Sequence, residues 1–188
     1  QAEHVEVFRE DEIPMQTQFN LLLSGQADHT FKDVSEQMKI STAEWSWNAR
    51  FADLDNDEWQ DLYVVNGVPI TQEFASNNFF HNQNGKFFVQ AQEEFGLDDH
   101  DHSSSYTYID LDRDGDLDLF VSRTDNTDGA LNMMLINDGS GNFSNEALTR
   151  LPQMNSSFGD KSSDSQFVDV NNDGYLDIIV ANSHMTIA

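Results

Sequence analysis

Acidic side chains recur at alternate positions in three short segments of this 188-residue sequence. The segments are Asp53-Leu-Asp-Asn-Asp-Glu-Trp-Gln-Asp61, Asp110-Leu-Asp-Arg-Asp-Gly-Asp-Leu-Asp118 and Asp169-Val-Asn-Asn-Asp-Gly-Tyr-Leu-Asp177. Alternate side chains of a tight loop can converge on one point, and a hard cation such as Ca²⁺ takes about 6–8 oxygen ligands at such a point. The spacing therefore predicts three calcium-binding loops, at residues 53–61, 110–118 and 169–177.

Each predicted ligand set combines the side chains at loop positions 1, 3, 5 and 9 with the backbone carbonyl at position 7. The predicted ligands are Asp53, Asp55, Asp57, Trp59 and Asp61 in the first loop, Asp110, Asp112, Asp114, Asp116 and Asp118 in the second, and Asp169, Asn171, Asp173, Tyr175 and Asp177 in the third. Gly115 and Gly174 at position 6 permit the sharp turn that brings the carbonyl round. Because Glu58 takes that place in the first loop, we expect a more strained turn and weaker calcium binding there.

An EF-hand begins with a similar pattern but also needs a glutamate at position 12 and flanking helices. Position 12 is a valine in all three segments (Val64, Val121 and Val180) and lies within an apolar run typical of a strand. This excludes an EF-hand. We expect a structural rather than a catalytic ion, because the loop surrounds it with protein oxygens.

The loops belong to a longer repeat. Their first aspartates are 57 and then 59 positions apart, and Phe31, Phe87 and Phe143, which lie upstream, are each 56 positions apart. Two markers with nearly one period indicate structural repeats.

Four short strands are predicted in each repeat, because β-branched and aromatic residues alternate with clusters of Asn, Asp, Gly and Ser. In the middle repeat the predicted strands are Ser104–Asp110, Leu117–Arg123, Asn132–Asn137 and Asn142–Ala147. Incomplete repeats are expected at both ends, with strands Phe19–Ser24, Thr30–Val34, Ser165–Asp169 and Tyr175–Asn182. Single helical turns are expected at Val34–Met38 and Glu93–Phe95. Four strands per repeat predict an all-β fold made of four-stranded, antiparallel β-propeller blades.

The repeated Asp-x-Asp-x-Asp-Gly-x-x-Asp loop followed by an apolar strand resembles the FG-GAP/VCBS repeat family of integrin-α-like propellers. The upstream Asn-x-x-Gly-x-Phe element resembles the bacterial VCBS-type members in particular, although the residues that give FG-GAP its name are not visible. The resemblance covers roughly residues 19–182. It implies calcium in each loop, a blade architecture and a role in adhesion or ligand binding outside the cell. We therefore divide the chain into an N-terminal extension at 1–18 and the repeats at 19–188.

Three loops are fewer than the roughly 4–8 blades that usually close a propeller. Three arrangements remain open. The chain can be part of a longer propeller, it can close by pairing with other copies, or it can form an open, curved stack. Open blade edges favour self-association.

The composition limits the partners of the chain. The formal net charge is −25, from 34 acids against 9 basic residues, and a field of that sign repels nucleic acids and anionic membranes while attracting divalent cations. Cysteine is absent, and no stretch approaches about 18 consecutive apolar residues, so membrane insertion is not expected. We expect a secreted or cell-surface protein, with the periplasm as an alternative, that binds a protein or glycan ligand.

Two other function classes stay open beside a non-catalytic calcium-binding module. One is a subunit of an extracellular filament or multimeric complex, and the other is a polysaccharide hydrolase or lyase on a propeller frame. No convergent catalytic set is visible in the sequence, so we expect no enzyme.

Histidines and tryptophans suggest further sites only weakly. His100 and His102 lack an evident third metal ligand, and His81 has no ligand-type constellation around it in the sequence. Trp45, Trp47, Trp59 and Tyr63 could stack on sugars, but we expect them in the core of a blade.

Overall fold

The computed structural model describes residues 19–41, 45–67, 76–124, 131–152 and 162–182. The N-terminal extension predicted at 1–18 lies outside the described residues. The described elements are strands with one short helix, α1 (Ala147–Arg150). No helix in the described part of the chain is long and apolar enough to cross a membrane.

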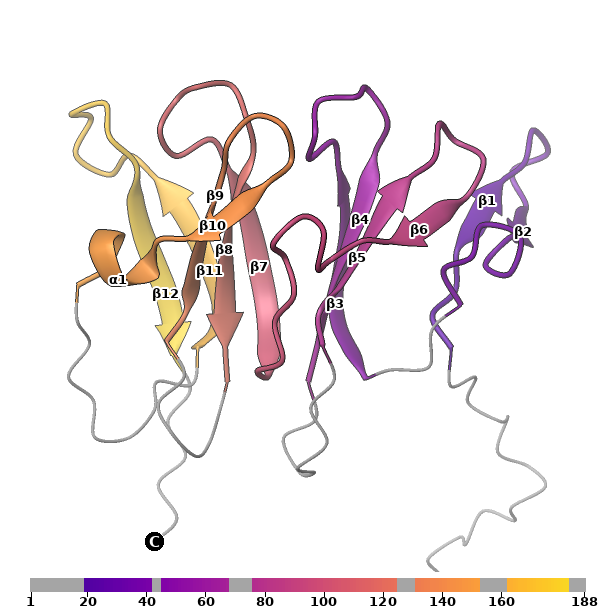
Figure 1. Ribbon diagram of the computed structural model, residues 1–188, viewed down its shortest axis with the longest axis horizontal. Helices are drawn as coiled ribbons and strands as arrows, with labels where there is room; N and C mark the ends of the chain where they lie inside the picture. Colours follow the sequence, from indigo (N-terminus) through magenta and orange to yellow (C-terminus); the bar gives the residue numbers. More distant parts are fainter. Residues whose placement is uncertain (1–18, 42–44, 68–75, 125–130, 153–161, 183–188) are drawn as a thin grey trace, which may run out of the picture.

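Two complete four-stranded antiparallel sheets form the centre of the molecule (Figure 1). The first blade contains β3 (Ser46–Ala52), β4 (Asp61–Asn66), β5 (Asn78–Asn82) and β6 (Phe88–Gln90). The second blade contains β7 (Ser103–Ile109), β8 (Asp118–Arg123), β9 (Met133–Asn137) and β10 (Phe143–Asn145). The strands follow one another in chain order across each sheet, which confirms the predicted four-stranded blades.

Two-stranded sheets flank the complete blades. They are β1 (Leu23–Gly25) with β2 (Phe31–Asp33), and β11 (Ser162–Val168) with β12 (Asp177–Asn182). Figure 1 shows the four sheets side by side in chain order. The described residues thus form a row of blades and not a closed ring.

The predicted single helical turns are present. The amide of Met38 donates to the carbonyl of Val34 at 2.8 Å, and the amide of Phe95 donates to the carbonyl of Ala91 at 3.1 Å. The short helix α1 occupies the corresponding place after β10, where the sequence predicted the end of a strand.

Apolar side chains of each central strand are buried on both faces. In β4, Leu62 and Val64 contribute to a core shared with Leu22, Met38 and Ile40, which flank β1 and β2, whereas Tyr63 and Val65 contribute to the core shared with the second blade. Successive strand residues point to opposite faces, so a strand packed between two neighbouring sheets needs a continuous apolar run. This explains why the runs that follow the acidic loops do not alternate with polar residues.

A repeated pair of polar side chains joins neighbouring blades at the end opposite the acidic loops. An asparagine of one sheet donates from Nδ2 to the serine hydroxyl that begins the first strand of the next, in three places: Asn20 to Ser46 at 2.9 Å, Asn77 to Ser103 at 3.0 Å and Asn132 to Ser162 at 2.9 Å. A β-bulge follows each of these serines. The regular spacing of these pairs was a third sequence marker that the sequence analysis missed.

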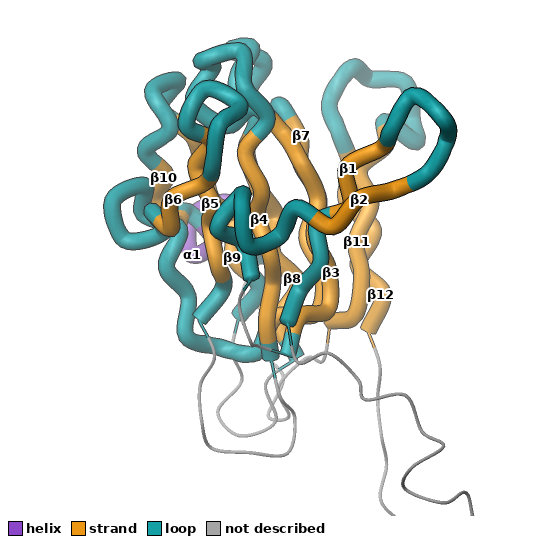
Figure 2. The backbone as a smooth tube through the Cα atoms, turned by 90° about the vertical axis from the view of Figure 1, so that its right-hand side faces the viewer, coloured by secondary structure: helices purple, strands orange, loops and turns teal. Residues whose placement is uncertain are grey.

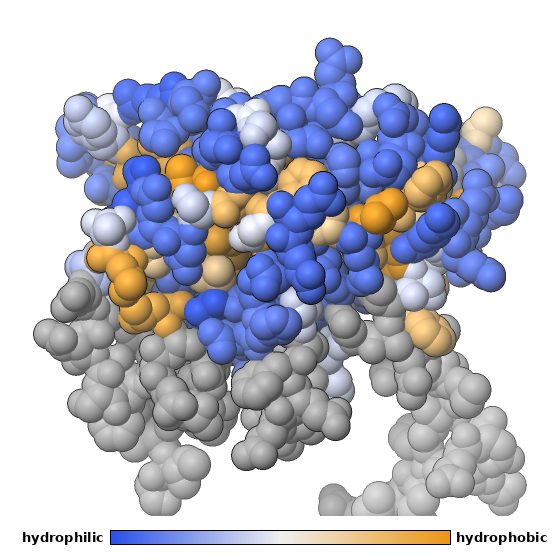
Figure 3. Space-filling view, viewed as in Figure 1, coloured by the Kyte–Doolittle hydropathy of each residue, from blue (hydrophilic) through white to orange (hydrophobic). Residues whose placement is uncertain are grey.

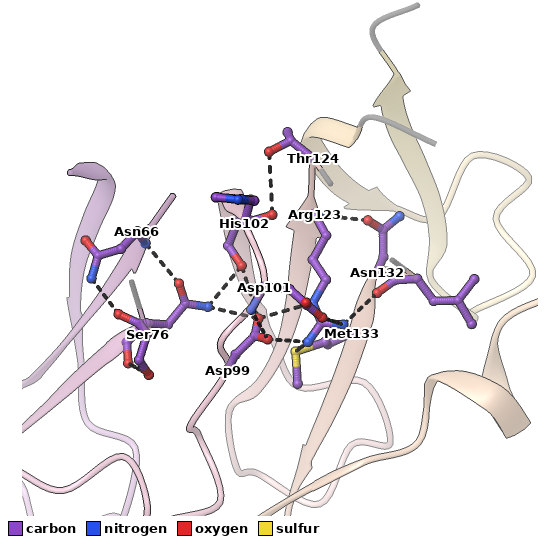
Figure 4. Close-up of polar contacts among 12 residues, drawn as sticks. Asn66, Ser76, Asp99, Asp101, His102, Arg123, Thr124, Asn132 and Met133 are labelled. Atoms are coloured by element: carbon purple, nitrogen blue, oxygen red, sulfur yellow. Dashed lines mark hydrogen bonds and ion pairs between the residues drawn. The ribbon is translucent and has the colours of Figure 1, made fainter. Parts of the chain in front are cut away.

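The second blade has an additional ion pair at this end (Figure 4). Arg123 contacts Asp99 through two guanidinium nitrogens, and its Nη1 lies 2.9 Å from Oδ2 of Asp101. Asp99 also accepts from Asn77 of the first blade at 3.1 Å. The paired charges are mostly buried, and together they hold the two complete blades in one orientation.

Candidate metal centre

The three acidic loops lie at one end of the molecule, each between the first and second strands of its sheet (Figures 1 and 2). Hydrophilic residues cover much of this end in Figure 3. The hairpin turns between the third and fourth strands lie at the same end, so that the acidic loops and the turns of neighbouring blades can touch.

The backbone of all three loops turns in the same way. Positions 4 and 6 adopt positive φ in each loop: Asn56 (60°) and Glu58 (72°), Arg113 (65°) and Gly115 (99°), and Asn172 (57°) and Gly174 (87°). A side chain in this region costs roughly 1–2 kcal/mol, except for glycine and, to a lesser degree, asparagine and aspartate. The strain predicted at Glu58 is therefore present in the first loop.

Backbone amides turn the acidic side chains toward the inside of each loop. The amide of Asp57 donates to Oδ1 of Asp53 at 3.1 Å and to Oδ1 of Asp55 at 3.2 Å. In the third loop, the amide of Asp173 donates to Asp169 at 3.2 Å and to Asn171 at 2.8 Å. The side chains at positions 1 and 3 are thus held by the same bonds, from the amide at position 5, in loops that are more than one hundred residues apart.

The aspartate at position 9 is held differently from the others. Asp61 accepts from the amide of Leu54 at 3.2 Å and from the amide of Asn82 at 2.8 Å, one bond to each carboxylate oxygen. Asp118 makes the same pair of bonds, to Leu111 and Asn137, both at 2.9 Å. Each of these carboxylates therefore fastens its loop to the third strand of the sheet as well as facing the loop interior.

An asparagine at the end of the third strand completes this fastening. Asn82 donates from Nδ2 to the carbonyl of Gln60 at 2.8 Å, and its Oδ1 accepts from the amide of Gly85 in the hairpin turn at 2.8 Å. Asn137 reaches across to the first blade and donates to the carbonyl of Leu54 at 2.8 Å. These bonds explain why the acidic loop and the hairpin turn keep one common period in the sequence.

Ligand-type oxygens gather inside the first two loops. Oxygen atoms of Asp53, Asp55 and Asp61 lie within 4.8 Å of one another, as do those of Asp110, Asp112 and Asp114. The third loop has an amide at Asn171, and among the described residues its acids form no such trio. Carboxylate and amide oxygens suit a hard divalent cation, so these donor sets fit calcium.

The remaining predicted ligands are placed near these groups. Asp57 joins Asp55 and His81 in a separate group of the first loop, whereas Asp118 and Asp177 accept the backbone amides of Leu111 and Val170. Trp59, Asp116 and Tyr175 are predicted to bind through their carbonyls, and their own amides donate to the aspartate at position 5 at 2.8–3.0 Å. Their roles as ligands stay predictions.

Burial makes the negative charge of several loop carboxylates unfavourable. It raises the pKa of Asp61 to about 6, against the lowering effect of the amides of Asn82 and Leu54. Burial also raises the pKa of Asp118 and, together with the neighbouring charge of Asp57, that of Asp55. By contrast, the pKa of the exposed Asp173 is lowered, chiefly by the amide of Tyr175. A divalent cation in the buried loops would stabilise their ionised carboxylates.

The comparison with known families concerns the second and third loops. Residues 110–180 match the family model described as FG-GAP-like repeat. This stretch is similar to an FG-GAP-like repeat. The match confirms the predicted family resemblance over these residues, while the VCBS-type assignment stays a prediction. No curated protein matches the chain.

The first blade lies outside the matched FG-GAP-like repeat but has the same construction. Its sheet has the same strand order, its first strand has a bulge at the same place, and its loop has the same two positive-φ positions. The first loop departs from the loops of the matched stretch at position 6, where Glu58 takes the place of glycine. We therefore treat the first loop as a variant of the FG-GAP-like loops that follow it.

His81 contradicts the sequence analysis, which found no constellation around it. Its Nε2 atom lies 2.9 Å from Oδ2 of Asp55 and 3.9 Å from Oδ2 of Asp57. The two aspartates precede β4, whereas His81 lies on β5. The hairpin between these strands brings the three residues together, and no short motif in the sequence indicates it.

The tryptophans also differ from the prediction. Tyr63 is fully buried as expected, but Trp45, Trp47 and Trp59 are 58%, 52% and 42% exposed. The rings of Trp45 and Trp47 are 6.4 Å apart and inclined by 47°. The interpretation of these three tryptophans as blade core was therefore wrong.

Proposed function

We propose that this chain is a non-catalytic, calcium-binding module of an extracellular protein. Calcium would occupy the acidic loops and fix the end of the blades on which a protein or glycan ligand binds. FG-GAP-like repeats are typical of extracellular proteins. Adhesion, ligand binding and secretion are part of the proposal.

The observation that carries the proposal is the repetition of one loop geometry. Three loops with a different residue at position 7 in each (Trp59, Asp116 and Tyr175) share the same pair of positive-φ positions. Burial of a loop carboxylate makes its negative charge unfavourable, and the hydrogen bonds that the protein donates to it offset this cost only in part. A loop that serves only as a polar turn would not need several acids directed at one point.

The proposed ion has a structural role. The predicted ligand set surrounds it with protein oxygens, which leaves no open position for a substrate. Its effect would be linkage: an ion that binds the folded loops more tightly than the unfolded chain stabilises the fold in proportion to the free calcium concentration.

Calcium titration calorimetry of the metal-free chain tests the proposal. We expect two calcium ions per chain, in the second and third loops, with dissociation constants on the order of 10⁻⁴–10⁻³ M as in other extracellular calcium modules, and weaker binding in the first loop. Asp112→Ala should remove one of these sites. The matched control, Asp98→Asn, replaces an exposed aspartate outside the loops and should retain all of them. Absence of calcium-dependent heat in the folded wild-type chain would reject the proposal.

Self-association is a second candidate, favoured by one observation. Among the described residues β12 pairs only with β11, whereas β4 and β8 each pair with strands on both sides. Its sheet also exposes Ile179 to 65%. An open strand edge beside an apolar face favours pairing with another chain. A molar mass that rises with concentration in light scattering would support this candidate, and a constant monomer mass would reject it.

A further inference from the structure

The first loop differs from the second in having a nitrogen donor directed at its carboxylates. The ring of His81 packs against Phe79 and Phe95, with ring centroids 6.3 and 5.1 Å away. This packing fixes the direction of the imidazole. The side chain of His81 is 23% exposed and that of Asp55 is 13% exposed, so the two groups meet largely out of water.

We propose that the first loop binds a first-row divalent transition metal, for which Zn²⁺ is the probe, through Nε2 of His81 and the carboxylates of Asp55 and Asp57. The second and third loops keep calcium. This inference rests on the proposed function only in that the loop is taken to be a metal site.

The first argument for this site is the chemical type of its three donor atoms. Calcium takes oxygen ligands, whereas imidazole nitrogen combined with carboxylate suits zinc and its first-row neighbours. Metal bonds of about 2.0–2.2 Å place neighbouring donor atoms roughly 3–3.5 Å apart. The separations of 2.9 and 3.9 Å from Nε2 to the two carboxylate oxygens lie on either side of that range. Small side-chain movements would place all three donors around one ion.

The second argument for this site is the surroundings of the Nε2 atom of His81. This atom is buried and makes no hydrogen bond of acceptable geometry, although a carboxylate oxygen lies 2.9 Å away. On the other side of the ring, Nδ1 lies 3.1 Å from the side-chain amide of Gln83. Turning that amide by 180° makes its oxygen the acceptor of an Nδ1–H group, which is the support that metal-bound histidines usually have. Nε2 then presents its lone pair to the metal.

The second blade supplies an internal comparison. Position 81 corresponds to Ile136, because each residue immediately precedes the asparagine whose amide binds the position-9 aspartate. Ile136 is 8% exposed and belongs to the apolar core between the second blade and β11–β12. The histidine is thus a feature of the first blade, and the second loop has only oxygen donors.

The second blade also packs against one side of the first loop, on the side of Asp55. Asn56 donates to the carboxylate of Asp116 in the second loop. A Cβ atom at Gly141 would lie 2.7 Å from the ring of Phe95 and 2.8 Å from Cβ of Asp55, so the hairpin turn of the second blade packs directly on the site. Exclusion of water strengthens the interaction of the carboxylates with a bound cation.

Zinc titration in excess calcium tests the proposal, because calcium then saturates the loops that have only oxygen donors. We expect one zinc ion per wild-type chain and a shift of the His81 ring nitrogens in long-range ¹H–¹⁵N spectra. His81→Ile, which installs the residue of the second blade, should weaken zinc binding at least about tenfold, since loss of a group that only hydrogen-bonds to a metal ligand already costs that much. Calcium binding by the second and third loops should not change.

Two further variants complete the test. His81→Gln keeps a polar side chain and should also lose zinc, whereas His100→Ala, which removes an exposed histidine elsewhere, should retain it. Unchanged zinc affinity in His81→Ile, or His81 resonances that do not respond to zinc, would overturn the inference while leaving the calcium proposal intact. A folded chain that binds neither metal would reject the proposed function itself.

Discussion

The carboxylates of each acidic loop have two different surroundings. In the first and third loops, the side chains at positions 1, 3 and 5 accept amides of their own loop, whereas Asp61 and Asp118 also accept an amide of the third strand of the sheet and are fully buried. A substitution at position 9 therefore removes part of the fold, and a substitution at position 3 removes part of a metal site.

Glu58 is the residue at which the first loop departs from the other two. Its φ of 72° is costly for a glutamate and free of cost for glycine. We predict that Glu58→Gly stabilises the protein by about 1 kcal/mol in metal-free buffer, where the gain comes from relieved strain. Chemical denaturation measures the change.

Glu93→Gly is the matched control for this substitution. Glu93 is exposed and does not have positive φ, so glycine there should lower stability through the entropy of the unfolded chain. Equal destabilisation by the two substitutions would show that the backbone at Glu58 is not strained.

The raised pKa of Asp61 predicts an effect of pH on the metal-free protein. Because its folded pKa of about 6 exceeds the ordinary value of 3.8, the folded chain holds a proton that the unfolded chain has lost between these pH values. The stability of the metal-free protein should therefore fall as pH rises from about 4 to 6. Asp55 and Asp118, whose pKa values are also raised, act in the same direction.

Calcium should reverse part of this loss, because it binds the ionised carboxylates. The increase in melting temperature on adding calcium to metal-free protein should thus be larger at pH 7 than at pH 5. An increase that is independent of pH over this range would contradict a role for the buried carboxylates in binding.

At the scale of elements, the position-9 aspartate joins the acidic loop to the third strand. Asp118→Ala would leave the amides of Leu111 and Asn137 without their acceptor. We predict a loss of about 2–4 kcal/mol in unfolding free energy, with or without calcium, because an unsatisfied buried donor costs about 1–3 kcal/mol. Asp112→Ala, in the same loop, should lower stability only when calcium is present. If the two variants respond alike in metal-free buffer, the distinction between these positions is wrong.

Much of the element arrangement could be predicted from the sequence, because turn residues and apolar runs recur with one period. The strands of the second blade end within one or two residues of their predicted limits, apart from β10, where α1 replaces the end of the strand. Local signals of this kind survive because each blade folds from consecutive segments. The residues that form the three acidic loops could be located in the sequence for the same reason.

Contacts between strands and between blades could not be predicted in this way. His81 meets Asp55 only because β4 and β5 pair, and Arg123 meets Asp99 only because the connection between the blades returns beside β8. Trp45 and Trp47 were expected in the core as aromatic residues, but Trp45 immediately precedes β3, Trp47 lies on it, and both side chains are more than half exposed. Residue type alone does not indicate which blade face has a neighbour.

At the scale of the whole molecule, the apolar cores lie between the sheets and the charge lies on the loops. One core joins the segments that flank β1 and β2 to the first blade, one joins the two complete blades, and one joins the second blade to β11–β12. A net charge of −25 opposes this compact arrangement. Calcium in the loops would reduce the repulsion at the end of the molecule where the acids are concentrated.

The most direct test of the central claim is a thermal melt of the purified chain in calcium and in chelator at neutral pH. The account predicts a markedly higher melting temperature in calcium, because bound ions stabilise the folded loops and leave the unfolded chain largely unaffected. Magnesium at the same concentration should have a smaller effect, since it prefers a tighter octahedral shell. Identical melting temperatures in calcium and in chelator would contradict the account and show that the acidic loops hold no calcium that stabilises the fold.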